Sequence, residues 1–172
     1  AALAHCAEWD FTDVLAEGMD DLALRELVTP QSFSVRFGAA LADAHRALGL
    51  DSDLQRRAWL TIVVQGGRSV RTGAVAEQLA MTREHLSRSF SAAGSPNLKR
   101  IIDLVRLIAA AELAKNAGYD LADVARVLDF ASASHLTSTA LRILGVKSAS
   151  LTRLRTQELI ERFKGRGRSR KD

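Results

Sequence analysis

Apolar residues recur at helical spacing along most of the chain. Only two prolines, Pro30 and Pro96, interrupt the sequence, and the alternation of apolar and polar residues that is typical of strands is scarce. In the stretch 31–48, every fourth residue falls on one stripe of a helix, and that stripe consists of Phe33, Phe37, Leu41 and His45. The pattern therefore predicts an all-α fold.

Turn residues divide this pattern into separate helices. Thr29-Pro30 favours a helix start, Gly49 to Ser52 ends one helix and caps the next, and Gly66-Gly67 ends that one. Gly94-Ser95-Pro96 precedes a long, mostly apolar helix. We predict helices over residues 22–27, 31–48, 53–65, 72–79, 82–92, 97–115, 121–128, 132–144 and 150–163.

Two of these helix pairs repeat each other at an offset of 49 to 50 residues. A helix pair with a turn of three to four residues and a small residue within its first helix is typical of a helix-turn-helix unit. Ala76 and Ala125 would let the two helices of each unit cross closely, and Leu86 and Leu136 would fill the angle between them. The alternative is an ordinary helical bundle in which these are core residues. The correspondences are Val75-Ala76 with Val124-Ala125, Leu79 with Leu128, and His85-Leu86 with His135-Leu136.

Charge is distributed unevenly along the chain. Residues 1–60 hold 5 Arg and no Lys against 10 acidic residues, whereas residues 61–172 hold 19 Lys and Arg against 10 acidic residues. The formal net charge of +4 therefore conceals an acidic front segment and a basic remainder. This asymmetry indicates a part that binds a polyanion, joined to another part that does not.

Other classes of protein find no support in the sequence. The richest apolar stretch, 101–114, contains charged residues and falls short of the about 18 residues that cross a membrane. The single cysteine, Cys6, has no neighbours at zinc-ligand spacing, so we expect neither a disulfide nor a metal site. Because phosphate loops and catalytic motifs are missing, we expect no enzyme activity and no cofactor. The start of the chain shows no signal-peptide pattern, which predicts a cytoplasmic protein.

The segment 75–90, Val-Ala-Glu-Gln-Leu-Ala-Met-Thr-Arg-Glu-His-Leu-Ser-Arg-Ser-Phe, resembles the first helix-turn-helix of AraC/XylS-type transcription regulators. Arg106-Leu107, Ala110 and Leu113 match the linking helix of that family, and residues 121–146 resemble its second unit. The resemblance covers about residues 53–158. It implies a seven-helix DNA-binding domain that places two recognition helices in successive major grooves of one face of the duplex. The sequence departs from the family pattern at Ile108, Ala109, Ala111, Asp129, Leu136, Ala140 and Ser148.

Helical spacing identifies the residues that the first recognition helix can present. Leu86 and Phe90 mark its buried side, so the opposite face would carry the polar residues. Arg88 can bind the O6 and N7 atoms of guanine, and Glu84 can accept from cytosine N4. Arg83 would hold a phosphate. The alternative is a solvated face with an Arg/Glu pair. The candidate DNA-binding residues of this unit are Thr82, Arg83, Glu84, Ser87 and Arg88.

The second recognition helix presents small residues without positive charge. We expect it to expose Ala133 together with three candidate DNA-binding residues, Ser134, Thr137 and Ser138. Hydroxyl side chains allow close approach and water-mediated contacts, so this unit would mainly dock on the backbone. His85 and His135 have no second ligand at metal spacing, and we expect both to be partly buried.

These observations predict three parts: an acidic segment 1–52, a tandem helix-turn-helix domain 53–163 and a basic, disordered tail 164–172. The front segment resembles the end of a sensory domain, and it, or a further domain, could form a homodimer. The leading interpretation is a sequence-specific regulator that binds double-stranded DNA. The alternative is a helical module that contacts RNA polymerase or a regulatory partner and binds DNA weakly. The tail could add phosphate contacts without sequence preference.

Overall fold

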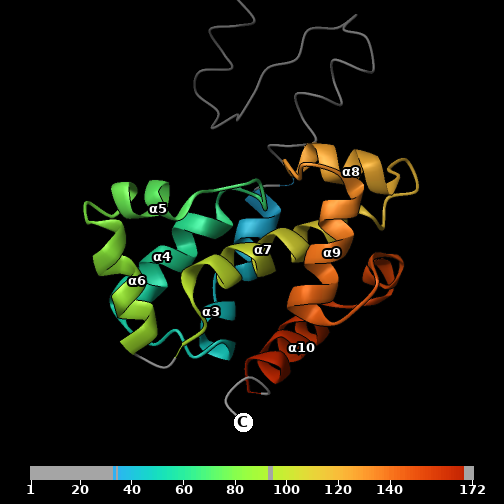
Figure 1. Cartoon of the computed structure of the whole chain (residues 1–172). Helices are drawn as coiled ribbons and strands as arrows, with labels where there is room; N and C mark the ends of the chain where they lie inside the picture. Colours follow the sequence, from blue (N-terminus) through green and yellow to red (C-terminus); the bar gives the residue numbers. More distant parts are fainter. Residues whose placement is uncertain (1–32, 34, 93–94, 169–172) are drawn as a thin grey trace, which may run out of the picture.

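The computed structural model describes residues 33, 35–92 and 95–168. Within these ranges the chain forms helices and no strands, so the prediction of an all-α fold is confirmed (Figure 1). Residues 35–41 are helical and precede the labelled elements. These are α3 (Ala44–Ala47), α4 (Asp53–Val63), α5 (Thr72–Gln78), α6 (Arg83–Ala92), α7 (Leu98–Leu113), α8 (Leu121–Val127), α9 (Ala133–Leu144), the 3₁₀ helix η1 (Ser148–Arg153) and α10 (Thr156–Arg168).

The long helix α7 lies between two helix pairs. Figure 1 shows α5 and α6 on one side of it and α8 and α9 on the other. Every residue from 101 to 111 is buried, because α7 packs against α4 toward the first pair and against α8, α9, α10 and η1 toward the second. Gly67 lies close to α7: its φ is +80°, and a Cβ there would lie 2.2 Å from Cβ of Ala109. The Gly66-Gly67 turn therefore lets α4 and α7 approach closely.

The predicted helix 31–48 is interrupted at residues 42–43. On its stripe Phe37, Leu41 and His45 are buried and Phe33 is half-buried, and the rings of Phe33 and Phe37 stack with their centroids 5.3 Å apart. The interruption has a local cause. Trp59 Nε1 on α4 donates to the Leu41 carbonyl at 2.8 Å, and the Ala42 carbonyl accepts from His45 Nδ1 at 2.9 Å. At the point where the regular helix ends, these two backbone carbonyls thus accept hydrogen bonds from side chains.

The C-terminal helix differs from the predicted 150–163 at both ends. Residues 148–153 form η1, Leu154 is extended, and Glu158 accepts from the Arg155 backbone N–H at 2.8 Å, which caps the start of α10. At its other end α10 continues through Arg168. The Arg166 guanidinium donates to the Leu141 carbonyl at 2.9 Å, so this part of the expected tail is helical and contacts the C-terminal end of α9.

Several predicted features fall outside the described residues. These are residues 1–32 and 34 of the front segment that resembles a sensory domain, which include the helix 22–27 and Cys6, and residues 169–172. Among the described residues, no helix is long and apolar enough to span a membrane.

Candidate nucleic-acid interface

The turns of the two helix pairs begin alike, although four residues separate α5 from α6 and five separate α8 from α9. Ala80 and Asp129 both adopt the left-handed conformation, with φ of 55° and 56°. The next residue in each turn donates its N–H back to the alanine of the first helix: Met81 to Ala76 at 3.0 Å, and Phe130 to Ala125 at 2.8 Å. The repeat that the sequence shows is therefore a repeat of backbone geometry.

The second helix of each pair also begins and packs alike. Thr82 Oγ1 accepts from the His85 N–H at 3.2 Å, and Ser132 Oγ accepts from the His135 N–H at 3.0 Å. Leu86 and Leu136 are both fully buried. Each pair therefore has the capped second helix and the interhelical leucine expected of a helix-turn-helix unit.

The outer face of α6 carries unpaired charge. Leu86 and Phe90 are buried, and the polar residues on the other side are exposed. Within the described ranges, Arg83 and Arg88 take part in no ion pair, and the alternative of an Arg/Glu pair on this face is not observed. Both guanidiniums are therefore available to a ligand. All five candidates of this unit are exposed: Thr82, Arg83, Glu84, Ser87 and Arg88.

The outer face of α9 differs from that of α6. Ser134 and Ser138 are exposed, and Ser138 Oγ donates to the His135 carbonyl at 3.0 Å. Thr137 was expected to be exposed but is half-buried, because its hydroxyl lies 3.0 Å from both the Ala133 carbonyl and Ser148 Oγ. Arg142, the arginine of this helix, bonds Asp103 of α7 at 3.0 Å. The charge on α9 therefore binds the protein's own linking helix.

The histidines of the two units are placed differently from the prediction. His85 and His135 are both exposed rather than partly buried. His135 packs edge-on against the Phe130 ring, with centroids 5.7 Å apart. Among the described residues, no three His, Cys, Asp or Glu side chains gather as metal ligands.

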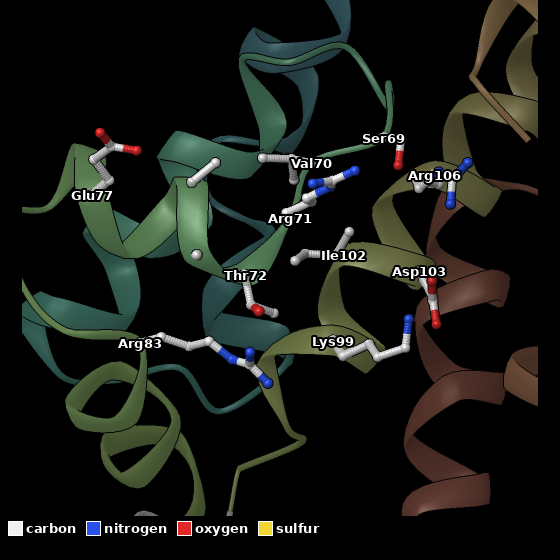
Figure 2. Close-up of a pocket in the computed structure, with 12 residues that line it drawn as sticks. Ser69, Val70, Arg71, Thr72, Glu77, Arg83, Lys99, Ile102, Asp103 and Arg106 are labelled. Carbon is white, nitrogen blue, oxygen red and sulfur yellow. The ribbon is translucent and has the colours of Figure 1, made fainter.

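A cleft of about 610 Å³ opens between α5, α6 and α7. Figure 2 shows the side chains of Arg71, Arg83 and Lys99 extending into it. They come from three elements, since Arg71 is the N-cap residue of α5, Arg83 begins α6 and Lys99 is in the first turn of α7. Asp103 and Glu77 also line the cleft, together with the hydroxyls of Ser69 and Thr72 and the buried Arg106.

Comparison with known proteins assigns this arrangement to a family. Residues 75–159 match the family described as "Helix-turn-helix domain". This region is a helix-turn-helix domain of the AraC/XylS type. No curated protein and no solved structure matches the chain. The domain is that of a DNA-binding transcription regulator.

The match begins at Val75, so α4 lies before it, although the resemblance in the sequence was expected to start near residue 53. α4 is nevertheless joined to the helix-turn-helix domain by packing. Gln55 is buried at its start and donates to Ser95 Oγ at 3.1 Å, and Ser95 in turn donates to the Gly49 carbonyl. The loop before α7 and the start of α4 are thereby held together.

Within this helix-turn-helix domain, Arg106 of α7 fixes the second turn. Its guanidinium donates to the carbonyls of Leu128 and Asp129, each at 3.0 Å, and lies 3.8 Å from the centroid of the Phe130 ring. Burial lowers the pKa of Arg106, and the nearby carboxylates of Asp103 and Asp129 oppose that shift. Arginine stays charged at any physiological pH, so the turn holds a buried cation. Asp129, one of the departures from the family pattern, contributes both a left-handed residue and a compensating charge.

Sequence reasoning missed most of the cleft. Arg71 and Lys99 lie outside both recognition helices, and no motif distinguishes them from other surface cations. Arg106 and Asp103 did carry a signal, because they are the charged residues in the otherwise apolar stretch 101–111. A charge in a fully buried stretch must find a partner, and both residues find one in the second unit.

Proposed function

We propose that this chain is a sequence-specific DNA-binding transcription regulator whose two recognition helices, α6 and α9, enter successive major grooves. In this proposal α6 carries most of the base specificity and α9 mainly docks on the DNA backbone. The observation that supports this division is the state of the arginines. Those of α6 are exposed and unpaired in the described structure, whereas Arg142 of α9 bonds Asp103.

Each exposed residue of α6 has a role that follows from its chemistry. Arg88 donates two hydrogen bonds to the O6 and N7 atoms of a guanine, and Glu84 accepts from cytosine N4. Ser87, beside them, bonds a base or a phosphate. Arg83, in the first turn, binds a phosphate and sets the register of the helix, with Thr82 next to it.

On α9 the candidate residues have short, uncharged hydroxyl side chains, which contact DNA more weakly than the arginines of α6. Ser134 and Ser138 are exposed and allow the duplex to approach closely. Thr137 is half-buried and its hydroxyl is within hydrogen-bond distance of two oxygens of the protein, so it supports the helix surface more than it reads bases. Water-mediated and backbone contacts are the ones that such a surface makes.

The direct test is binding to DNA sequences selected from a random pool. Fluorescence anisotropy should show that the selected duplex binds at least about 1000-fold more tightly than a shuffled duplex of the same composition. The affinity should also fall steeply with salt concentration. Salt dependence without sequence preference would indicate non-specific binding. Absence of both would contradict the proposal and favour the alternative, a module that contacts RNA polymerase or another protein.

A further inference from the structure

We propose that the cleft between α5, α6 and α7 binds one backbone phosphate of the duplex and thereby joins the first unit to the linking helix. This inference rests on the proposed function. It assigns Arg71 and Lys99, which lie outside both recognition helices, to the DNA interface together with Arg83 (Figure 2).

The cleft carries the charge that a phosphate needs. Arg71, Arg83 and Lys99 are exposed and, in the described part of the chain, form no ion pair. Arg106 adds a fourth, buried cation to the lining. Of the two carboxylates that line the cleft, Asp103 is paired with Arg142 at 3.0 Å. The cleft therefore has an excess of positive charge, which favours an anion.

Its neutral groups also suit phosphate oxygens. Ser69 and Thr72 place hydroxyl groups in the lining, and hydroxyls donate to phosphate oxygens. Arg106 Nε is buried and has no hydrogen-bond partner, whereas the same guanidinium donates to two carbonyls of the second turn. The positive charge of Arg106 is thus held in place by the protein before any ligand arrives.

The position of Arg83 favours DNA as the source of the phosphate. Arg83 is the first residue of α6, and a recognition helix in a major groove has a backbone phosphate near its first turn. The three cations are exposed, so a small anion would compete poorly with water and salt for them. A polyanion gains from releasing its condensed counterions when such cations neutralise it.

A phosphate in this cleft would fix the angle between the two units. α5 and α6 pack against each other and against α4, whereas α7 packs against α4 and, more extensively, against the second unit. Arg71 and Arg83 belong to the first group of helices and Lys99 to α7. One phosphate bound by all three would hold α6 at a set position relative to α7, and through α7 relative to α9.

The test uses the full chain and the selected duplex. Arg71→Gln with Lys99→Gln is compared with a control of equal charge change, Arg46→Gln with Lys115→Gln. The two control cations lie outside the cleft, and each pairs with a carboxylate three positions before it, Arg46 with Asp43 and Lys115 with Glu112. We expect the cleft variant to lose about tenfold in affinity for the selected and the shuffled duplex alike, with the salt slope reduced by about 0.9. The control variant should keep the affinity and the salt slope of the wild type close to unchanged.

Duplexes in which one phosphate is replaced by an uncharged methylphosphonate locate the contact. Wild type should lose affinity at one backbone position beside the sequence read by α6, and the cleft variant, which keeps Arg83, should lose less there than wild type. Thermal unfolding of the variants checks that they remain folded.

The outcomes separate this proposal from the function on which it rests. If wild type selects and binds a specific duplex but the cleft variant matches it in affinity and salt slope, the cleft proposal alone is overturned. If wild type binds no duplex, both fail. Saturation of the cleft by inorganic phosphate at constant ionic strength, with unchanged DNA affinity of the cleft variant, would assign it to a free phosphate and overturn the DNA assignment.

Discussion

The two helix-turn-helix units have similar backbone conformations. Their recognition helices differ in the side chains that they expose and in the elements that they pack against. α6 presents unpaired arginines and packs against α5 and α4. α9 presents hydroxyls and packs against α7, α8, α10 and η1. Its turn is bonded by Arg106 and its C-terminal end by Arg166. The arginines of α6 are unpaired in the described structure, whereas the arginine of α9 is paired with Asp103 of α7.

This difference indicates how a repeated motif can divide its work. Both units have a left-handed turn residue, a capped second helix and an interhelical leucine, so these shared features do not distinguish them. In the proposed function, the placement of a few arginines decides which unit reads DNA. A helix whose cation is paired with another part of the protein is fixed in position by that pair. A helix whose cations are exposed can bind phosphates and guanines.

Removing Arg106 should have the largest effect, because it removes the support of the second unit. Arg106→Ala leaves the carbonyls of Leu128 and Asp129 without their donor and removes the contact with Phe130. We expect the free energy of unfolding to fall by about 3 kcal/mol in urea denaturation. The control Arg126→Ala removes an exposed i,i+3 pair with Asp123 and should cost less than about 0.5 kcal/mol. Equal losses in the two variants would contradict the special role of Arg106.

Replacing Arg88 tests the reading function of the first unit. Arg88→Ala should cost about 1 to 3 kcal/mol of binding to the selected duplex and relax the preference at one base pair. Ser134→Ala, a matched change on an exposed residue of α9, should leave the preference at every position as in wild type. Competition between duplexes that differ at single positions measures both. Unchanged selectivity of Arg88→Ala would remove this residue from the interface.

The two left-handed turn residues allow a comparison of strain. Ala80→Gly relieves the cost of φ at 55° and should raise the free energy of unfolding by about 0.5 to 1 kcal/mol. Asp129→Gly should gain less, because Asp tolerates this conformation better and its carboxylate lies near Arg106. Urea denaturation of both variants shows which substitution raises the free energy of unfolding more. A larger gain at position 129 would show that the charge of Asp129 does not stabilise the turn.

Acid should affect the start of the second unit more than that of the first. The Asp120 carboxyl accepts from the Asp123 N–H at 2.8 Å, which lowers its pKa, whereas Arg71 at the equivalent position of α5 makes no cap bond. Because the folded-state pKa is below the unfolded value of about 3.8, the cap stabilises above that pH and is lost as the pH falls through the lowered value. Amide exchange of α8 should accelerate there in wild type and change little with pH in Asp120→Asn. A parallel pH response in the two proteins would exclude Asp120 as its cause.

Much of the fold followed from local patterns. The stripe of 33, 37, 41 and 45 faces the core, with Phe33 half-buried and the other three buried, and helix caps stand at or next to the predicted helix starts, at Ser52, Thr82, Asn97 and Ser132. These features depend on neighbours within about one helical turn, which a sequence displays directly.

The parts that the sequence did not predict depend on contacts between distant residues. Arg106 bonds the carbonyls of two residues that lie 22 and 23 positions after it in the sequence, and Arg142 bonds Asp103, which lies 39 positions before it. Arg166 extends the last helix because carbonyls of α9 lie within its reach. The cleft likewise combines Arg71, Arg83 and Lys99 from three elements, and nothing local to any of them indicates the other two.

The central claim is that the first unit reads sequence and the second one docks. Position-by-position enrichment of DNA selected from a random pool by the full chain tests it most directly. We predict one half-site of strong base preference, which loses one preferred base pair in Arg88→Ala, and a second half-site, about one helical turn away, with weak preference. Two half-sites of equal preference, with the second altered by Ser134→Ala or Ser138→Ala, would contradict the account.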